Sequence, residues 1–340
     1  MSNSNIFVHR HTPSSRIAIT LALLAVLVIP SMPFWATSGQ IRLIIELSCL
    51  IAIAQMWNLL AGYGGMVSVG QQAFIGAGGY SLFVLSTYGG LNPFWSVPLA
   101  VILPALLAAP SYLLLRKLDG PYFAIGTWVL AEVFRLVTGN LAVVNAGSGM
   151  TLRAMGQFTA HQREIGLTIL CALLLIVTVG GTFLMLRSRL GLAMTAMRDD
   201  PVSAASQGVN VGRMRFGIFV VAAMGTGLAG AIYYMAQLRI SPSSGFDPYW
   251  SSICIFIVMV GGIGRLEGPI VGALLYFFAT RLFGQYGASY MIVLGLLTLL
   301  IALFAPGGLW SLISKVRDWP WFPVGHRLEY QRHGKTESVR

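Results

Sequence analysis

The sequence predicts an all-α polytopic membrane protein, because of its composition and the lengths of its apolar runs. Hydrophobic residues make up 56% of the 340 residues and charged residues only 10%. A soluble domain is about a quarter charged. The mean hydropathy is +0.75. Apolar stretches separated by short polar ones recur along the chain, which has room for about ten helical spans of ~20 residues each.

Ten apolar runs are candidates for membrane-spanning helices. They lie at about 17–35, 41–61, 66–88, 94–115, 122–141, 164–186, 214–237, 247–263, 268–283 and 287–305. The first run follows a polar leader and resembles a signal peptide, but its length and the later spans predict an uncleaved first helix. We therefore expect a leader at 1–16, a transmembrane permease domain at 17–313 and a tail at 314–340.

The basic residues predict the orientation. With the N-terminus inside, six of the 22 Lys and Arg residues lie outside or within the membrane: Arg42, Arg135, Arg153, Arg163, Arg239 and Arg281. Because Lys and Arg are enriched in cytoplasmic loops, both termini should be cytoplasmic. The net charge of +11 is explained by this membrane orientation, and membrane lipid is an expected partner. No soluble segment interleaves basic and aromatic residues, so we expect no nucleic-acid partner.

The polar stretch 187–215 lies between two apolar runs and should form a cytoplasmic loop. Asp200 can cap a helix, Pro201 suits the first helical position and Gly208 is a natural stop, so about two turns of helix should form. Small side chains on this helix favour docking into a groove of a partner, although an ordinary positively charged loop is the alternative. The docking residues would be Arg198, Asp199, Asp200, Pro201, Val202, Ser203, Ala204, Ala205 and Gly208.

Two stretches are rich in glycine, at 62–79 and at 261–268. Glycine at this density weakens a helix and lets backbones approach closely, so we expect a break or a close helix crossing in the first stretch. Interrupted segments can mark an internal repeat and a substrate path in transporters, whereas plain helix packing is an equally open explanation. We assign a candidate path for a polar solute to Ser68, Gln71, Gln72 and Phe74.

Few ionisable residues enter the predicted spans. Glu132 and Arg135 are three residues apart on one helical face, within reach of an ion pair. Such residues are functional candidates, but a pair that neutralises itself and holds the helices together is the alternative. Glu46 lies nearer the outer end of its span. The cysteines, all in apolar runs, should be small buried residues and not a disulfide or metal set.

The sequence contains no recognisable catalytic constellation. There is no His-Glu-x-x-His, no pair of membrane aspartates and no histidine or cysteine cluster. The run Gly334-Lys335-Thr336 resembles the end of a phosphate-binding loop, but Glu329 stands where the leading glycine should be. We expect no enzyme activity, no metal and no cofactor, and any ATP must be bound by another chain.

Several motifs together resemble the permeases of branched-chain amino-acid ABC transporters. Residues 58–71 read NLLAGYGGMVSVGQ, and GAGGY follows at 76–80. The segment GPYFAI occupies 120–125 and precedes Glu132 and Arg135. The closing motifs are GGIG at 261–264, GP at 268–269 and FAPGGL at 304–309. The combination is similar to the M-type subunit, and the likeness covers about 40–313.

The resemblance implies a role for the loop. In this family the loop between the sixth and seventh spans carries a coupling helix that contacts the ATP-hydrolysing subunit, and 198–208 matches it in spacing. The glutamate of the broader motif is lacking, since Val202 precedes Ser203 and Ala204. The run at 145–150 also departs from the family pattern, which leaves the solute open among amino acids, amides and urea.

The function implied by the resemblance is that of a permease subunit of a bacterial ATP-binding cassette importer in the inner membrane. Its partners would be separate ATP-binding cassette subunits, a second permease of the H-type and a periplasmic or extracellular solute-binding protein. An ion-coupled secondary transporter with Glu132 as carrier is the alternative. Whether the permease pair is a homodimer or a heterodimer is left open by the sequence.

Overall fold

The computed structural model describes residues 6–9, 20, 23–305, 307–311, 327–332 and 335–339. Most of the predicted leader at 1–16 and tail at 314–340, including Gly334, lies outside these residues. Within the leader and tail, strand β1 (Ile6–His9) pairs with β4 (Arg327–Arg332), which pairs with β5 (Lys335–Val339), all antiparallel.

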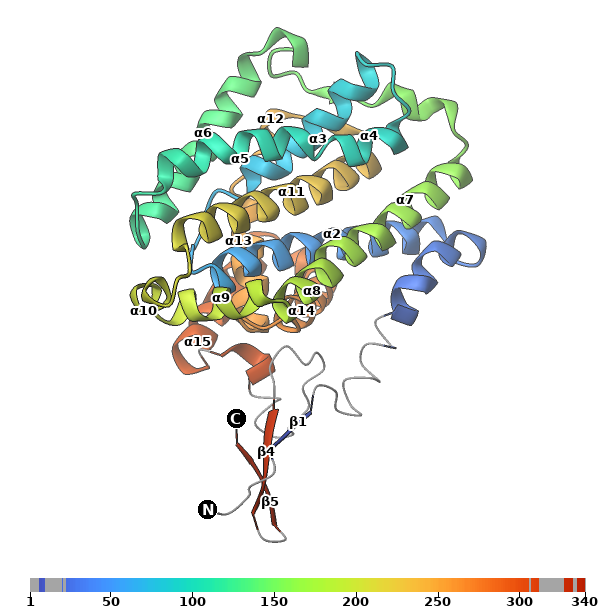
Figure 1. Cartoon of the computed structure of the whole chain (residues 1–340). Coiled ribbons are helices and arrows are strands. Elements are labelled where there is room, and N and C mark those ends of the chain that lie inside the picture. Colours follow the sequence, from blue (N-terminus) through green and yellow to red (C-terminus); the bar gives the residue numbers. More distant parts are fainter. Residues whose placement is uncertain are drawn as a thin grey trace.

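Helices make up the body of the protein (Figure 1). The α-helices that lie wholly within the described residues are α2 (Ser38–Asn58), α3 (Gln72–Thr87), α4 (Pro93–Leu99), α5 (Ile102–Leu115), α6 (Pro121–Asn140), α7 (Ala160–Leu175), α8 (Gly181–Arg187), α9 (Arg189–Asp199), α10 (Pro201–Ser206), α11 (Val211–Gln237), α12 (Pro242–Gly245), α13 (Tyr249–Gly261), α14 (Gly268–Phe283) and α15 (Ala288–Phe304). Short strands β2 (Met150–Thr151) and β3 (Arg239–Ile240) pair with each other.

Four helical segments of the described chain are long and apolar enough to cross a membrane: Ser38–Tyr63, Pro93–Leu115, Ala160–Arg187 and Val211–Gln237. The other apolar helices are shorter or less apolar, so the fold is a polytopic helical membrane protein while the count of ten spans stays a prediction. Two of the long segments begin with the same device, a capping box of Thr37 with Gln40 and of Thr159 with Gln162.

The predicted break in the first glycine-rich stretch is confirmed. Helical structure ends at Tyr63, and α3 starts only at Gln72. Gly65 lies in this gap at φ +67°, a conformation that favours glycine. The run 66–88 is therefore not one helix, because its first residues form an irregular segment that enters the bundle.

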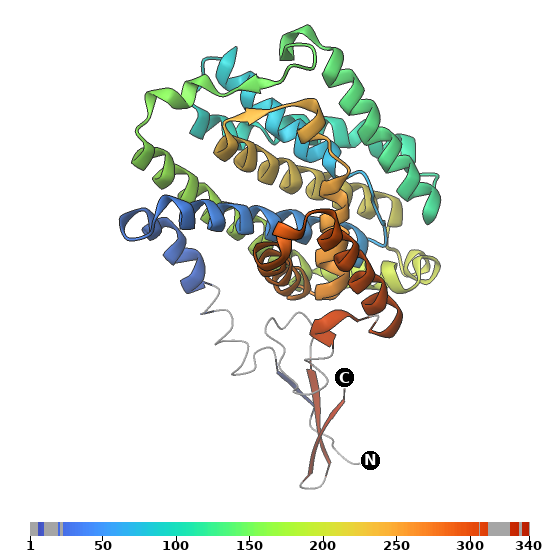
Figure 2. The same cartoon turned by 180° about the vertical axis from the view of Figure 1, so that it is seen from behind.

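The close helix crossing is found where α3 meets α11, the helix at the centre of the bundle. A side-chain carbon on Gly78 would overlap the carbonyl of Gly227, and one on Gly230 would overlap the backbone of Ile75. Glycine is required at these positions because the two backbones touch directly. Helix α11 also packs on α2 and α5, while α13, α14 and α15 form a group beside α2 (Figure 2).

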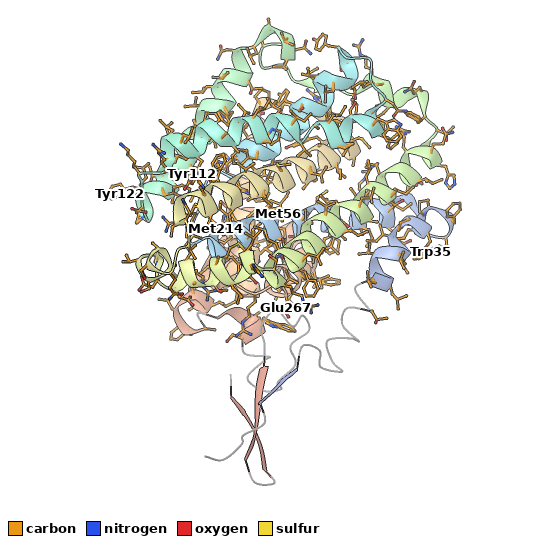
Figure 3. The ribbon with its side chains drawn as sticks, in the orientation of Figure 1. Trp35, Met56, Tyr112, Tyr122, Met214 and Glu267 are labelled. Carbon is orange, nitrogen blue, oxygen red and sulfur yellow. The ribbon has the colours of Figure 1, made fainter. Side chains whose placement is uncertain are left out.

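The surface and interior differ as expected for a protein surrounded by lipid. Large apolar side chains such as Tyr122 and Trp35 lie exposed at the periphery, whereas Met56 is buried (Figure 3). The three cysteines are free and buried, as predicted. With no water inside a bilayer, exposed apolar side chains on helices are the stable arrangement.

The bundle has two ends. The first, which we call the α10 end, holds α10, the last residues of α2 and the first residues of α11 (Figure 1). The opposite end holds the first residues of α2, the last residues of α11 and the pair β2 and β3. The candidate sites lie at the α10 end and inside the bundle.

Candidate functional site

The short helix α10 begins and ends as the sequence predicts. Asp200 is its N-cap, and its Oδ1 accepts hydrogen bonds from the backbone N of Val202 at 2.9 Å and of Ser203 at 3.2 Å. Pro201 is the first helical residue. Gly208 has φ +89° just after the helix. These bonds satisfy amides that would otherwise lack a partner at the helix start.

The carboxylate of Asp200 is held in its ionised form. The hydroxyl of Ser203 donates to Oδ2 at 2.5 Å, and this bond is the main cause that lowers the pKa of Asp200. The backbone amides of Ser203 and Val202 lower the pKa further. Hydrogen bonds to a carboxylate favour its charged form. The cap therefore stays charged over the ordinary pH range.

The outer face of α10 differs from the expected one in a single residue. Val202 is 79% exposed, and Ser203, Ala205, Ser206 and Gly208 are exposed as well. Ala204, expected on the surface, is only 2% exposed and belongs to a buried cluster with Met194 and Met197 of α9. Helix α10 packs on α9, so one of its faces must turn inward, and Ala204 lies on that face.

Arg198 connects the loop to the body of the protein. Its Nη1 donates to the carbonyl oxygen of Gly62 at 3.4 Å, and its Nε donates to Asp199 Oδ1 at 3.0 Å. A side-chain carbon added to Gly264 would lie 2.8 Å from Nη1 of Arg198. The guanidinium thus lies directly over both glycine-rich stretches, which the sequence alone did not bring together.

Asn58 joins the two glycine-rich stretches beneath Arg198. Its Nδ2 donates to the carbonyl oxygen of Arg265 at 2.9 Å, and its Oδ1 accepts from the backbone N of Gly264 at 2.8 Å. A side-chain carbon on Gly62 would lie 2.5 Å from the Gly264 nitrogen. Sequence reasoning missed this junction, although a single asparagine within an apolar run was a usable signal.

The predicted path residues lie in a buried polar cluster. Gln71 Nε2 donates to Thr226 Oγ1 at 2.7 Å, and the Gln71 backbone N donates to Ser251 Oγ at 3.0 Å. The Ser251 hydroxyl donates to Gln72 Oε1. Ser68 Oγ accepts from the backbone N of Gly70 at 3.2 Å. Gln71 and Gln72 therefore tie the start of α3 to the middle of α11 and to the first turn of α13.

Phe74, the fourth predicted path residue, does not join this polar cluster. Its ring packs edge-on against Phe219 of α11, with centroids 5.6 Å apart. It is 3% exposed and part of the same buried cluster as Ala204. Phe74 is thus placed as a packing residue between α3 and α11.

Unsatisfied amide groups add to the polar interior. Oε1 of Gln71 and both polar atoms of the Gln55 side chain are buried, with no hydrogen-bond partner among the described residues. Each such group costs about 1–3 kcal/mol. Native interiors keep few of them, and those that persist have a reason. Gln55 on α2 is a candidate path residue that the sequence reasoning passed over.

The predicted pair of Glu132 and Arg135 is formed. Arg135 Nε donates to both carboxylate oxygens, at 3.0 and 2.8 Å, and its Nη2 lies 2.5 Å from Oε1. The side chains are 36% exposed for Arg135 and 41% for Glu132, on α6 at the edge of the bundle. The pair is neutral as a unit, which lowers the cost of keeping two charges on a helix in the membrane.

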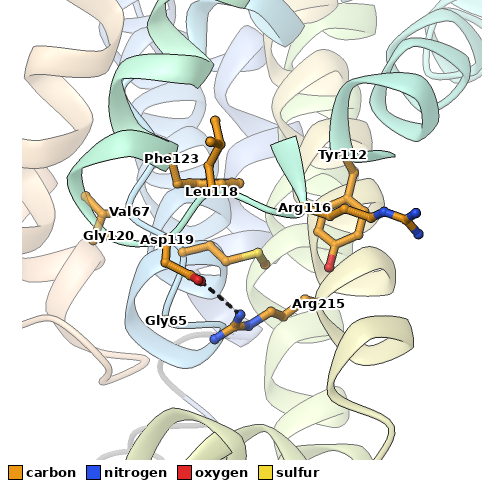
Figure 4. A pocket seen from close by; sticks show the side chains of 10 residues that line it. Gly65, Val67, Tyr112, Arg116, Leu118, Asp119, Gly120, Phe123 and Arg215 are labelled. Atoms are coloured by element: carbon orange, nitrogen blue, oxygen red, sulfur yellow. Dashed lines mark ion pairs between the residues drawn. The ribbon is translucent and has the colours of Figure 1, made fainter. Parts of the chain in front are cut away.

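The α10 end is strongly basic. A cavity of about 50 Å3 there is lined by Gly65, Asp119 and Arg215, among other residues (Figure 4). Arg215 Nη1 lies 3.7 Å from Asp119 Oδ1. Arg116 and Arg213 line an adjacent surface cavity with Arg215. These side chains come from the segment after α5 and from the start of α11, so separate segments bring positive charge to one end.

Comparison with known proteins identifies the family to which the chain belongs. The model of a family described as a branched-chain amino acid transport system, permease component, matches residues 41–302. The high-affinity branched-chain amino acid transport system permease protein LivM of Salmonella typhimurium is 28% identical over 321 residues, which cover 85% of this chain and 74% of that protein. LivM of Escherichia coli is 27% identical over 320 residues with the same shares.

A more distant relative is the probable branched-chain amino acid transport permease protein LivH of Methanocaldococcus jannaschii. It is 22% identical over 271 residues, which cover 72% of this chain and 84% of that protein. The ribose import permease protein RbsC of Escherichia coli is 23% identical over 222 residues, 63% of this chain and 68% of that protein. No solved structure matches the chain significantly.

Proposed function

Because the chain belongs to the family of permease components of branched-chain amino acid transport systems, we propose that it is a membrane-spanning subunit of an ATP-binding cassette importer. The importer would move branched-chain amino acids, or a related small polar solute, across the bacterial inner membrane. ATP would be hydrolysed by separate nucleotide-binding subunits. A second, H-type permease and a solute-binding protein would complete the assembly.

The observation that carries this proposal is the construction of α10. The helix presents Val202 and small side chains outward, and the neighbouring Arg198 contacts Gly62 in the body of the bundle. A nucleotide-binding subunit that binds this face could move α9 and α10 together with the contact between Gly62 and Gly264. Transport requires such a contact, since a partner shifts two states only through a difference in its interaction with each.

The exposed part of α10 defines the docking face. We assign the contact to Val202, Ser203, Ala205 and Gly208, with Asp200 and Pro201 shaping the helix. Ala204 contributes from below, as the residue that seats α10 on α9. Arg198 and Asp199 link the docking face to the glycine junction.

The solute path would run along the polar cluster inside the bundle. Ser68, Gln71 and Gln72 offer uncharged hydrogen-bonding groups, and Gln55 adds an unpaired amide. The close approaches of Gly62 with Gly264 and of Gly78 with Gly227 would allow small backbone movements without displacing bulky side chains. Phe74 would act as a packing element that follows α11 when the path opens.

The charge distribution supports a cytoplasmic position for the α10 end. Arg116, Arg198, Arg213, Arg215 and Arg265 all lie at this end, on loops or helix termini. Positive residues near membrane-spanning segments favour the cytoplasmic side. Under this proposal both termini are cytoplasmic, and the opposite end of the bundle faces the binding protein.

Reconstitution tests the proposed class. The complete importer is reconstituted in proteoliposomes: this chain, the second permease, the nucleotide-binding subunits and the binding protein. The vesicles should take up leucine, isoleucine or valine only when ATP is supplied on the side of the nucleotide-binding subunits. The same vesicles with a nucleotide-binding subunit unable to hydrolyse ATP are the control. Uptake at the same rate with and without ATP would refute the importer assignment.

An ion-coupled secondary transporter is the second candidate, because Glu132 is an ionisable group on a membrane helix. The bidentate bond with Arg135 ties up both of its carboxylate oxygens. Vesicles that contain this chain alone, energised by a proton or sodium gradient, decide between the two. Gradient-driven uptake without ATP would favour the secondary transporter.

A further inference from the structure

A second cavity, of about 680 Å3, lies in the half of the bundle away from α10. It is bounded by Glu46 in the first half of α2, Gln237 at the end of α11, Tyr249 at the start of α13 and Thr280 near the end of α14. Small-molecule sites are typically about 300–1,000 Å3. The cavity therefore has room for one small solute.

Its walls carry charges of both signs together with apolar surface. Glu46, Asp247 and Arg239 supply two carboxylates and one guanidinium. Leu50 and Ile253 supply aliphatic surface. A solute that matches all three kinds of group carries a carboxylate, an ammonium group and an aliphatic side chain. This combination describes a zwitterionic aliphatic amino acid.

The charged groups keep capacity for a ligand. Arg239 has no side-chain hydrogen bond or ion pair with any described residue, and its side chain is exposed to the cavity region. Glu46 uses only Oε2, toward Arg281 Nη2 at 3.2 Å. Asp247 uses only Oδ1, which accepts from the backbone N of Tyr249 at 2.9 Å. Guanidinium groups bind carboxylates through paired, charge-assisted hydrogen bonds.

The cavity adjoins the polar cluster through the first turn of α13. Tyr249 and Ile253 of this helix line the cavity, and the Tyr249 hydroxyl lies 2.7 Å from that of Tyr276. Ser251, in the same turn, bonds to the backbone of Gln71 and to the side chain of Gln72. One helical turn therefore separates the cavity from the predicted path.

We propose that this cavity is a receiving site where the permease binds the amino acid before it enters the path. Arg239 binds the carboxylate, Glu46 or Asp247 binds the ammonium group, and Leu50 and Ile253 contact the aliphatic side chain. The inference rests on the proposed importer function, under which this end faces the binding protein. It assigns a selective role to residues that the family motifs do not include.

A neutral sugar is the competing ligand class, because aromatic residues such as Trp250 also line the cavity. A sugar would leave Arg239 and Asp247 without charged partners among the described residues, whereas Glu46 keeps its ion pair with Arg281. Desolvating unpaired charges for a neutral ligand lowers affinity. The charges therefore favour the zwitterion, and ribose serves as the probe for the alternative.

Cysteine protection tests the site. Gln237→Cys places a reactive thiol at the cavity, while the native cysteines are buried. The variant is assembled with the second permease and the nucleotide-binding subunits, without binding protein, and treated with a charged methanethiosulfonate reagent. Leucine at about ten times its dissociation constant should leave roughly one site in eleven free and slow the modification accordingly.

Leucine analogues show which groups of the ligand the site recognises. Isocaproate lacks the ammonium group of leucine and isoamylamine lacks its carboxylate, so each should protect much less than leucine. Arg239→Gln should abolish leucine protection, whereas Arg153→Gln, an exposed arginine outside the cavity, should leave it intact. Val143→Cys, exposed but outside the cavity, should react at the same rate with or without leucine.

The outcomes separate this inference from the importer assignment. If leucine uptake is driven by ATP but leucine does not protect the Gln237→Cys thiol from modification, the receiving site is refuted. The importer assignment is unaffected by that result. A thiol that never reacts in the assembled complex would show that the second permease fills the cavity, which also overturns the site. Protection by ribose and not by leucine would reassign the ligand. If wild-type vesicles take up no branched-chain amino acid, the proposed function itself fails.

Discussion

Arg198 donates a hydrogen bond to the carbonyl oxygen of Gly62, 136 residues earlier in the chain, at 3.4 Å. The bond joins a residue next to the exposed helix α10 to the place where the two glycine-rich stretches meet. A movement of α9 and α10 could therefore be passed through this side chain to the helical turn that follows α2. The structure thus contains a hydrogen bond between α9, which precedes the proposed docking face, and the helical bundle.

Removing this link should uncouple ATP hydrolysis from uptake. A hydrogen bond from a charged group contributes about 1.5–3 kcal/mol, and partial exposure of Arg198 places it at the low end. We expect Arg198→Ala to lower the leucine taken up per ATP hydrolysed about tenfold, which corresponds to about 1.4 kcal/mol. Arg189→Ala, an exposed arginine at the start of α9, is the matched control and should keep the normal ratio.

The crossing of α3 and α11 should tolerate no side chain at Gly78. Gly78→Ala would overlap the Gly227 carbonyl, and overpacking of this kind costs about 1–3 kcal/mol. Gly217→Ala, elsewhere in α11, meets no atom within 4 Å and should be neutral or stabilising by about 0.4–1 kcal/mol. Thermal unfolding in detergent, read by fluorescence, compares the two. Equal melting temperatures would show that the crossing is not tight.

The cap of α10 should be insensitive to pH in the physiological range. Hydrogen bonds lower the pKa of folded Asp200, so its stabilising contribution is complete above the ordinary aspartate pKa and is lost only as the pH falls through the lowered value. The ratio of loop cleavage in the wild type to loop cleavage in Asp200→Asn, measured in inverted vesicles, should therefore be constant over roughly pH 5 to 8. Asp200→Ala should speed cleavage at every pH, while Asp200→Asn, an equally good cap, should not.

The ion pair on α6 should act as a unit. Glu132→Gln leaves Arg135 without its carboxylate partner, so we expect less protein in the membrane. The double variant Glu132→Gln with Arg135→Gln should restore the amount, and uptake per molecule should equal that of the wild type. Quantitative immunoblotting alongside uptake measures both. Complete loss of uptake in the double variant at normal protein level would instead make Glu132 a carrier.

The sequence predicted the local features of the site and missed the long-range ones. The N-cap, the first residue and the end of α10 could be predicted from Asp200, Pro201 and Gly208. Each of these residues affects only the backbone a few residues away. The burial of Ala204 could not be predicted in this way, since it depends on how α10 packs against α9. Local chemistry sets the helix, and tertiary packing decides which of its faces is free.

The same distinction applies inside the bundle. A break near Gly65 could be predicted from glycine density, but the contact of Gly62 with Gly264 arises only when α2 and the segment after α13 meet. Asn58 and Gln55 were passed over because single polar residues in apolar runs do not reveal their partners. Their roles depend on neighbours about 200 residues away or on buried surroundings.

Labelling of Val202→Cys in intact and inverted membrane vesicles tests the central claim most directly. Val202 is 79% exposed on α10, and the native cysteines are buried. We predict that a membrane-impermeant maleimide labels this thiol only in inverted vesicles, and that bound nucleotide-binding subunits protect it. Labelling from the outside, or labelling that these subunits leave unchanged, would contradict the account of α10 as the helix through which ATP hydrolysis drives this permease.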